Sequence, residues 1–255
     1  MIERRPSSEV NSDPRLVAPK TIDLRQSPLS EKALKTALAR PCQPFTVGGF
    51  RPSLDPRASV FGGVRVFGSK DRWPTRDGKP LLGIFQINLQ DAKFVPDALR
   101  DLAMIQLFIA DDSYPTGQTL CTIAPSLDAV AVVRTYRTLE NLVPIDAPAS
   151  ALKAFEIAWD IPKTDYANHD VAPVDTSIND VYGYEWAQRV EGGKLGGWPA
   201  TIQSEPWWDY SDTKHRFEHV IQLGPEAKSG WYADSLFFAR AQDDPSKWAV
   251  DIQMF

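Results

Sequence analysis

Hydrophobic and polar residues alternate along most of the chain after about residue 45. A period of two places successive side chains on opposite faces of a strand, so this pattern predicts a body built from strands. In the first part of the chain the pattern covers Phe45–Phe50, Val60–Phe67, Leu81–Leu89, Ala103–Ala110, Thr119–Ile123 and Ala129–Tyr136. It returns at His215–Leu223, Ser235–Arg240 and Trp248–Phe255. We therefore expect mainly antiparallel or mixed sheets.

A helical pattern interrupts the strands in a few short segments. Ser30 is a good N-cap for a helix over Glu31–Ala39, which Pro41 ends. A second helical pattern lies around Ser150–Trp159, and a possible third covers Val181–Val190. Strands combined with a few short helices predict an α+β fold.

One module occurs twice in diverged form, which predicts an internal duplication. In the first copy Gly62-Gly63 and Trp73-Pro74 precede a strand that contains Gln86. In the second copy Gly196-Gly197-Trp198-Pro199 precedes a strand that contains Gln222. Each glutamine is expected on the strand face opposite its apolar neighbours, where its amide either bridges the two halves or faces solvent.

The repeat sets the predicted domain organisation. Residues 1–44 form an N-terminal arm and a short helix, because the first 28 residues are polar and interrupted by prolines. Residues 45–255 form a single domain made of two repeats, at about 59–136 and 181–255.

The order of these blocks resembles the YwqG-like bacterial domain family of unknown function. The similarity covers roughly residues 59–255. It is carried by Phe61-Gly62-Gly63, Trp73-Pro74, Gly78–Leu82, Phe85–Leu89, Ile105–Ile109, Lys194–Pro199, Ile202-Gln203, Gln222-Leu223, Trp231–Asp234 and Leu236–Phe238. The sequence departs from the family pattern at Leu99–Ala103, Ala233 and Ser235, which puts local turns in doubt. The resemblance implies an α+β fold with internal duplication, no established activity, and an immunity (antitoxin) role for some members.

Composition and charge exclude several classes of function. The 28 basic and 33 acidic residues are interspersed, and the net charge of −5 gives no footprint for nucleic acid. The longest nearly apolar stretch, Leu102–Ala110, is far shorter than the roughly 20 residues of a membrane-spanning helix. Cys42 and Cys121 have no CxxC partner, and no apolar leader opens the sequence. We expect a cytoplasmic protein without a cofactor, a metal or a membrane partner.

Two groups of residues invite a catalytic interpretation. His215, Glu218 and His219 match the HxxEH pattern of zinc peptidases, but that site requires a helix, whereas this segment is predicted as a strand. Asp111-Asp112 and Asp243-Asp244 each follow a predicted strand, where aspartates favour turns. A zinc-dependent hydrolase therefore remains the alternative to the leading hypothesis.

The leading hypothesis is a non-catalytic protein-binding module. Trp207-Trp208 are adjacent, so in an extended segment one of them faces away from the core. Exposed aromatic rings anchor protein interfaces, which makes Trp207, Trp208, Tyr210 and Trp231 the candidate binding residues, together with Gln86 and Gln222. The expected partner is a protein, possibly a toxin that this chain neutralises. A small-molecule sensor with its site at the junction of the two halves is a third possibility.

Overall fold

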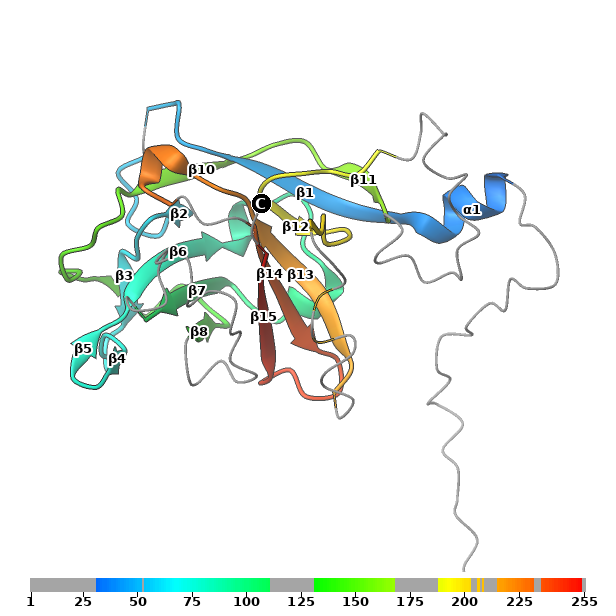
Figure 1. Cartoon of the computed structure of the whole chain (residues 1–255). Helices are drawn as coiled ribbons and strands as arrows, with labels where there is room; N and C mark the ends of the chain where they lie inside the picture. The colour runs from blue at the N-terminus through cyan, green and yellow to red at the C-terminus, as the bar shows by residue number, and fades with distance from the viewer. Residues whose placement is uncertain are drawn as a thin grey trace, which may run out of the picture.

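Antiparallel strands dominate the computed structural model (Figure 1), which describes residues 31–51, 53–110, 131–167, 188–202, 206, 208, 215–231 and 235–253. The α-helix α1 spans Glu31–Leu38. The first eight strands are β1 (Ala39–Val47), β2 (Val60–Phe61), β3 (Val66–Gly68), β4 (Thr75–Arg76), β5 (Lys79–Pro80), β6 (Leu82–Asn88), β7 (Met104–Ile109) and β8 (Ala131–Tyr136). The next seven are β9 (Leu142–Pro144), β10 (Phe155–Trp159), β11 (Lys163–Tyr166), β12 (Lys194–Gly196), β13 (Phe217–Leu223), β14 (Ser235–Ala241) and β15 (Trp248–Gln253). Short 3-10 turns lie at η2 (Leu89–Asp91), η3 (Asp97–Leu99) and η6 (Ala227–Ser229).

Eleven of the strands form one sheet. Their order is β15-β14-β13-β12-β1-β10-β2-β6-β7-β8, with β11 paired beside β1. Strand β1 joins the two halves of the chain, because Ala39–Pro44 pair with β11 and β12 while Phe45–Val47 pair with β10. All pairings between these eleven strands are antiparallel.

The sheet curls so that its two arms face each other across one apolar core. The rings of Phe85 on β6 and Phe238 on β14 meet edge to face with their centroids 5.6 Å apart. Phe61 and Trp231 pack in the same way at 6.5 Å. Strands β6 and β14 are far apart in strand order, so these contacts require a nearly closed, barrel-like sheet.

A buried arginine also connects the two arms. The side chain of Arg240 on β14 is 6% exposed, and its guanidinium binds both carboxylate oxygens of Asp101 and the carbonyl of Ala98. These hydrogen bonds from Arg240 lower the pKa of Asp101. The two partners belong to the η3 segment, which this contact holds against the second half of the chain.

The predicted α+β class is wrong. Among the described residues, one eight-residue helix accompanies fifteen strands, so the fold is mostly β. The helix predicted around Ser150–Trp159 is absent, and Phe155–Trp159 instead form β10. This strand pairs with β1 on one side and β2 on the other, and sheet hydrogen bonds on both sides outweigh a weak local helix preference.

The strongest strand predictions are confirmed within a few residues at β6, β7, β8, β13, β14 and β15. The helix predicted over Glu31–Ala39 is confirmed as α1. The strand predicted over Val60–Phe67 divides into β2 and β3, because Gly62 adopts a positive φ of 82° between them. Strand β1 begins earlier than predicted, at Ala39, and includes Pro41 and Pro44.

Some predictions fall outside the described residues. These are the strand over Thr119–Ile123, most of the helix over Val181–Val190, and the arm over residues 1–28. No described helix has the length and apolar character that crossing a membrane requires.

Candidate functional site

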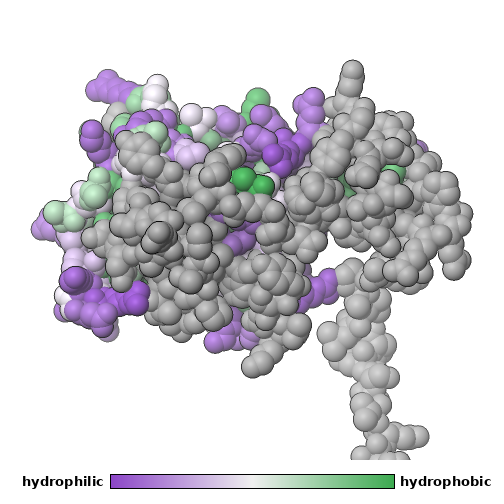
Figure 2. Space-filling model, in the orientation of Figure 1, coloured by the Kyte–Doolittle hydropathy of each residue, from purple (hydrophilic) through white to green (hydrophobic). Residues whose placement is uncertain are grey.

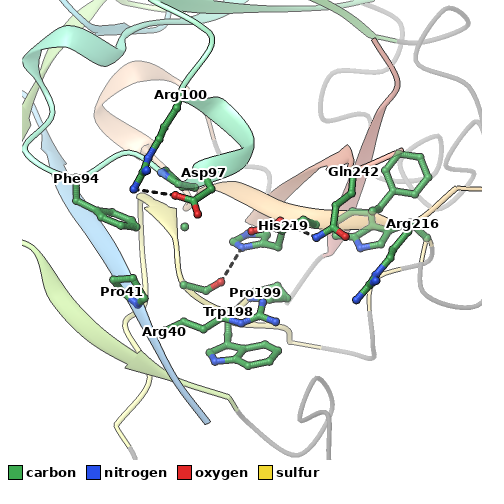
Figure 3. A pocket seen from close by; sticks show the side chains of 16 residues that line it. Arg40, Pro41, Phe94, Asp97, Arg100, Trp198, Pro199, Arg216, His219 and Gln242 are labelled. Atoms are coloured by element: carbon green, nitrogen blue, oxygen red, sulfur yellow. Dashed lines mark hydrogen bonds and ion pairs between the residues drawn. The ribbon is translucent and has the colours of Figure 1, made fainter. Parts of the chain in front are cut away.

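A pocket of about 660 Å³ lies where β1, the η3 segment and the second half of the chain meet. Figure 3 shows Phe94 and Arg100 on one side of it, Arg216 and Gln242 on the opposite side, and His219 between them. These side chains come from segments that are distant in sequence. The pocket is therefore a product of the curled sheet rather than of one local motif.

The second Gly-Gly-Trp-Pro motif forms one wall of this pocket. Gly196 and Gly197 have φ values of 66° and 70°, which are unfavourable for other residues. A Cβ on Gly197 would lie 2.4 Å from Asp165 Oδ2, so the turn also requires the absence of a side chain. The indole Nε1 of Trp198 donates a 2.8 Å hydrogen bond to the carbonyl of Leu38. The motif is thus fixed against β1 and α1.

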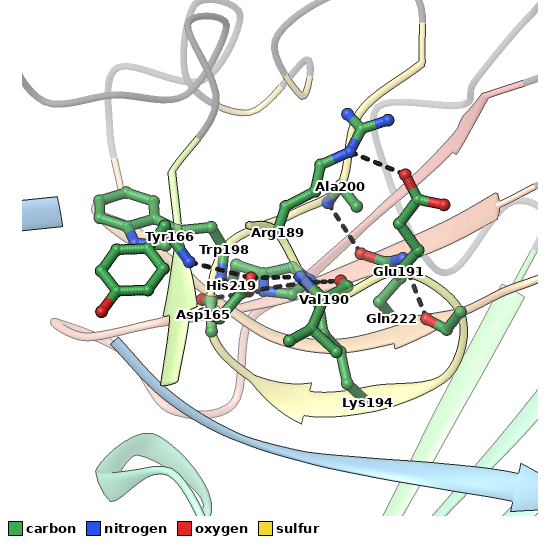
Figure 4. Close-up of polar contacts among 12 residues, drawn as sticks. Asp165, Tyr166, Arg189, Val190, Glu191, Lys194, Trp198, Ala200, His219 and Gln222 are labelled. Carbon is green, nitrogen blue, oxygen red and sulfur yellow. Dashed lines mark hydrogen bonds and ion pairs between the residues drawn. The ribbon is translucent and has the colours of Figure 1, made fainter. Parts of the chain in front are cut away.

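A fully buried ion pair supports the turn from behind (Figure 4). Lys194 Nζ lies 2.7 Å from Asp165 Oδ2, and both side chains are 0% exposed. The Asp165 carboxylate also accepts hydrogen bonds from the backbone N–H groups of Tyr166, Val190 and Trp198, at 3.1, 2.7 and 2.8 Å. Burial lowers the pKa of Lys194, and the charge of Asp165 opposes that shift. Asp165 therefore ties β11 and β12 to the Gly197–Trp198 peptide.

His219 lines the pocket and is 6% exposed. Its Nδ1 lies 3.4 Å from the carbonyl oxygen of Gly197, which can only accept a hydrogen bond. Nε2 is also buried from solvent. Burial, followed by the charge of Lys194, lowers the pKa of His219 to about 3, although hydrogen bonding by the backbone of Gly197 and of Ile221 raises it. The imidazole is therefore neutral at physiological pH.

Three arginines and two carboxylates line the same pocket. Both carboxylates have partners of their own: Arg100 lies 2.8 Å from Asp97, and Gln242 donates to Glu218 at 2.8 Å. Arg40 lies over the Trp198 ring, 3.3 Å from its centroid. The guanidinium of Arg216 is exposed and makes no hydrogen bond or ion pair with the residues that the structure describes. The pocket is therefore locally basic on an acidic protein.

Two of the four aromatic residues predicted as a binding surface are buried. Trp208 is 4% exposed and Trp231 is 1% exposed. Trp208 packs against Phe237 and also lines the pocket, whereas Trp231 belongs to the main core. Trp207 and Tyr210 lie outside the described residues. The buried pair forms no exposed surface in this conformation.

Gln86 and Gln222 are buried and bind backbone groups within their own halves. Gln86 donates to the carbonyls of Pro56 and Ala58 and accepts from the N–H groups of Arg65 and Val66. Gln222 donates to Gly192 and accepts from Ala200. Neither amide faces solvent, and none of these six bonds crosses between the halves.

The two glutamines occupy corresponding positions. Each pairs across the sheet with the residue two places before its Gly-Gly pair, Val60 in the first half and Lys194 in the second. Gln86 also donates to the carbonyl of Ala58, and Gln222 donates to that of Gly192. Both carbonyls lie four residues before the first glycine of the corresponding Gly-Gly pair. A second hollow, of about 430 Å³ and largely apolar, lies beside Gly62-Gly63. This correspondence supports the proposed duplication.

The HxxEH residues lie on and beside a strand. His219 lies on β13, whereas His215 precedes the first residue of that strand, Phe217. The segment therefore lacks the helix on which two histidines four residues apart face one metal ion. His215 pairs with Asp243 at 3.0 Å, and hydrogen bonds from His215 and from the Arg216 N–H lower the pKa of this aspartate. Among the described residues, no group of three or more His, Cys, Asp or Glu could hold a metal ion.

The remaining predicted residues have structural roles or lie outside the described ranges. Asp244 accepts hydrogen bonds from the N–H and hydroxyl of Ser246, as expected for a turn. Cys42 is buried, and burial raises its pKa to about 11. Asp111-Asp112 and Cys121 lie outside the described residues.

Sequence reasoning missed the lining residues Arg40, Phe94, Arg100 and Arg216, and also the Asp165–Lys194 pair. No local pattern marks them, because strand pairing across the whole sheet brings them together. The one available signal was Gly196–Pro199, which the sequence suggested only as scaffold.

The curled antiparallel sheet and its basic pocket define a β domain with a cleft at the junction of its halves. A family model described as a domain of unknown function (DUF1963) matches residues 59–243, and the chain belongs to this family. The match does not carry the YwqG-like name, which stays a resemblance. No curated protein matches the chain.

Proposed function

We propose that this chain is a non-catalytic binding module that holds a small anionic ligand in the pocket beside Gly196–Pro199. The observation that carries the proposal is the set of three arginines in the walls, of which Arg216 has no side-chain partner among the described residues. Both carboxylates in the walls are already bonded to neighbours. An anion would thus meet the guanidinium of Arg216, while both carboxylates are already occupied by their neighbours.

The volume and position of the pocket support a small ligand. About 660 Å³ falls within the range of small-molecule sites, which are roughly 300–1,000 Å³. The site also lies at the junction of the two halves, where a sensor was one of the expectations from the sequence. Phe94 and Trp198 supply apolar surface beside the charged groups.

The protonation state of His219 favours binding over catalysis. A general acid or base works best with a pKa near the operating pH, whereas the pKa of His219 is lowered to about 3. The HxxEH alternative does not gain support, because its residues lie on and beside a strand rather than on a helix.

The toxin-neutralising role implied by the family resemblance stays a prediction. Two of its four aromatic residues are buried. The large hydrophobic side chains that are exposed in the described ranges are Phe50, Leu54, Val143 and Ile161. Figure 2 shows apolar colour in separate small areas of the visible described surface rather than as one patch.

Isothermal titration of the full chain with hydrogen phosphate, citrate and malate at low salt tests the proposal. At least one anion should bind, and Arg216→Gln or Arg100→Gln should each weaken it about three- to tenfold, since hydrogen bonds to charged groups contribute about 1.5–3 kcal/mol before screening. Arg57→Gln makes the same charge change on an exposed loop outside the pocket and should leave affinity unchanged. No binding by any anion, or equal loss in Arg57→Gln, would contradict the proposal.

A further inference from the structure

We propose that the hollow beside Gly62-Gly63 is a second binding site, which takes a small uncharged aromatic compound of one or two rings. The site goes beyond the proposed function, because it lies in the first half of the chain and its lining is apolar rather than basic. It does not depend on anion binding in the basic pocket, so the two claims stand or fall separately.

The hollow and the basic pocket share one frame in the two copies of the proposed module. Gly62-Gly63 and Trp73 line the hollow, as Gly196-Gly197 and Trp198 line the basic pocket. The first glycine of each pair has a positive φ, 82° at Gly62 and 66° at Gly196. A Cβ on Gly62 would lie 2.3 Å from the carbonyl oxygen of Lys153, so this turn requires the absence of a side chain. The same frame therefore borders a pocket in each half.

Trp73 forms a fixed aromatic wall of the hollow. Its indole Nε1 donates a 2.7 Å hydrogen bond to the carbonyl of Leu81. The ring packs against Phe67 and Phe108, with centroids 5.5 and 5.3 Å away, and glycine at position 83 lets it lie close to β6. Because the polar atom of Trp73 is already bonded, the indole offers a ligand its apolar surface. Aromatic rings pack favourably against such a surface, edge to face or offset.

The rest of the lining favours a ligand without charge. Its apolar members include Pro80, Leu81, Pro144, Ile145, Pro148 and Leu152. Among the described residues that line the hollow, Arg65 alone carries a charged side chain, and Glu156 compensates it at 2.9 Å. The Glu156 side chain is only 5% exposed, so this pair is held in place. A charged ligand would lose its hydration without meeting an unpaired opposite charge, whereas a neutral ring loses little.

The size and exposure of the hollow fit one or two aromatic rings. Its volume of about 430 Å³ lies in the lower part of the range for small-molecule sites, roughly 300–1,000 Å³. Ala147, Ala149 and Ser150 line the hollow and are exposed, so a ligand can enter past the segment between β9 and β10. The small side chains of these residues leave space that larger ones would fill.

Matched neutral and anionic probes test the proposal on the full chain. At pH 7, 2-naphthol is uncharged and 2-naphthoate is its anionic counterpart, and indole and indole-3-carboxylate form a second pair. Affinity is measured on the indole N–H resonance of Trp73 in ¹H–¹⁵N spectra, which reports on this hollow rather than on the basic pocket. We expect at least one neutral probe to shift this resonance and to bind about tenfold tighter there than its anion.

A variant that fills the hollow assigns the binding to it. Ala149→Phe adds a large ring at a lining position and should weaken the neutral probe about tenfold or more. Ala151→Phe is the matched control, because it makes the same change at an exposed position of the same segment outside the lining. It should leave the affinity unchanged. Thermal unfolding of both variants verifies that they fold.

The outcomes separate this proposal from the proposed function. If no neutral probe shifts the Trp73 resonance, or if the anionic probes bind there equally well, the second site is refuted while anion binding in the basic pocket stands. Equal losses in Ala149→Phe and Ala151→Phe would also overturn it. If neutral probes bind in the hollow but no anion binds in the basic pocket, only the proposed function fails. The comparison of probes on the unmodified chain is decisive even if a variant does not fold.

Discussion

Replacing Lys194 with methionine should strongly destabilise the protein. The substitution keeps the length of the side chain but removes the charge that lies 2.7 Å from Asp165, with both side chains 0% exposed. Removing one partner of a buried ion pair costs about 3–5 kcal/mol, because the other charge is left without compensation. For a chain of this size, each kcal/mol lowers Tm by about 2–4 °C, so the expected decrease is about 6–20 °C.

Urea denaturation followed by tryptophan fluorescence measures this cost. Arg100→Gln serves as the control, because it breaks an exposed pair whose side chains are 69% and 82% exposed. It should change the free energy of unfolding by less than about 1 kcal/mol. The double variant Asp165→Asn with Lys194→Met should cost less than the sum of the two single variants, since the partners couple directly. A loss below about 1 kcal/mol in Lys194→Met would refute the assigned role of this pair.

Three further predictions concern the buried polar groups. Gln86→Leu should lower the free energy of unfolding by about 2–4 kcal/mol, because it leaves four backbone groups unpaired. Gln222→Leu leaves only two unpaired and should lower it less, which urea titrations of both variants would show. Burial lowers the pKa of His219 from 6.5 to about 3 in the folded state. Between these two pH values the unfolded state binds a proton that the folded state does not, so stability should fall as the pH decreases through this window. His219 contributes about 1.4 kcal/mol per pH unit to that slope, and His219→Leu should remove it; an unchanged acid profile would argue against a buried neutral ring. Cys42, with its pKa raised to about 11, should resist iodoacetamide at pH 8 until the chain unfolds, as site-resolved mass spectrometry would show.

The strands of the core could be predicted because their local pattern agrees with their final environment. Strand β6 and strand β14 consist largely of apolar residues and are buried along their whole length. The helix predicted around Ser150–Trp159 failed because its local pattern carries no information about β1 and β2, which pair with β10 on either side. The predicted fold class was therefore wrong because pairing with strands distant in sequence, rather than local composition, determines the structure of this segment.

The candidate site was harder to predict than the core. The Gly196–Pro199 motif was visible in the sequence, yet its role as a pocket wall depends on Arg40 from β1 and Arg100 from the η3 segment. Asp165 and Lys194 likewise meet only because β11 and β12 both pair with β1. A charged residue that will be buried has no distinctive local pattern before its partner is known.

The position of a bound anion is the strongest evidence for the proposed function, and a crystal structure of the full chain grown with the tightest-binding anion would reveal it. We expect the anion between Arg216 and Arg100, with the Gly197–Trp198 turn unchanged. An empty pocket with the anion bound elsewhere on the surface would contradict it.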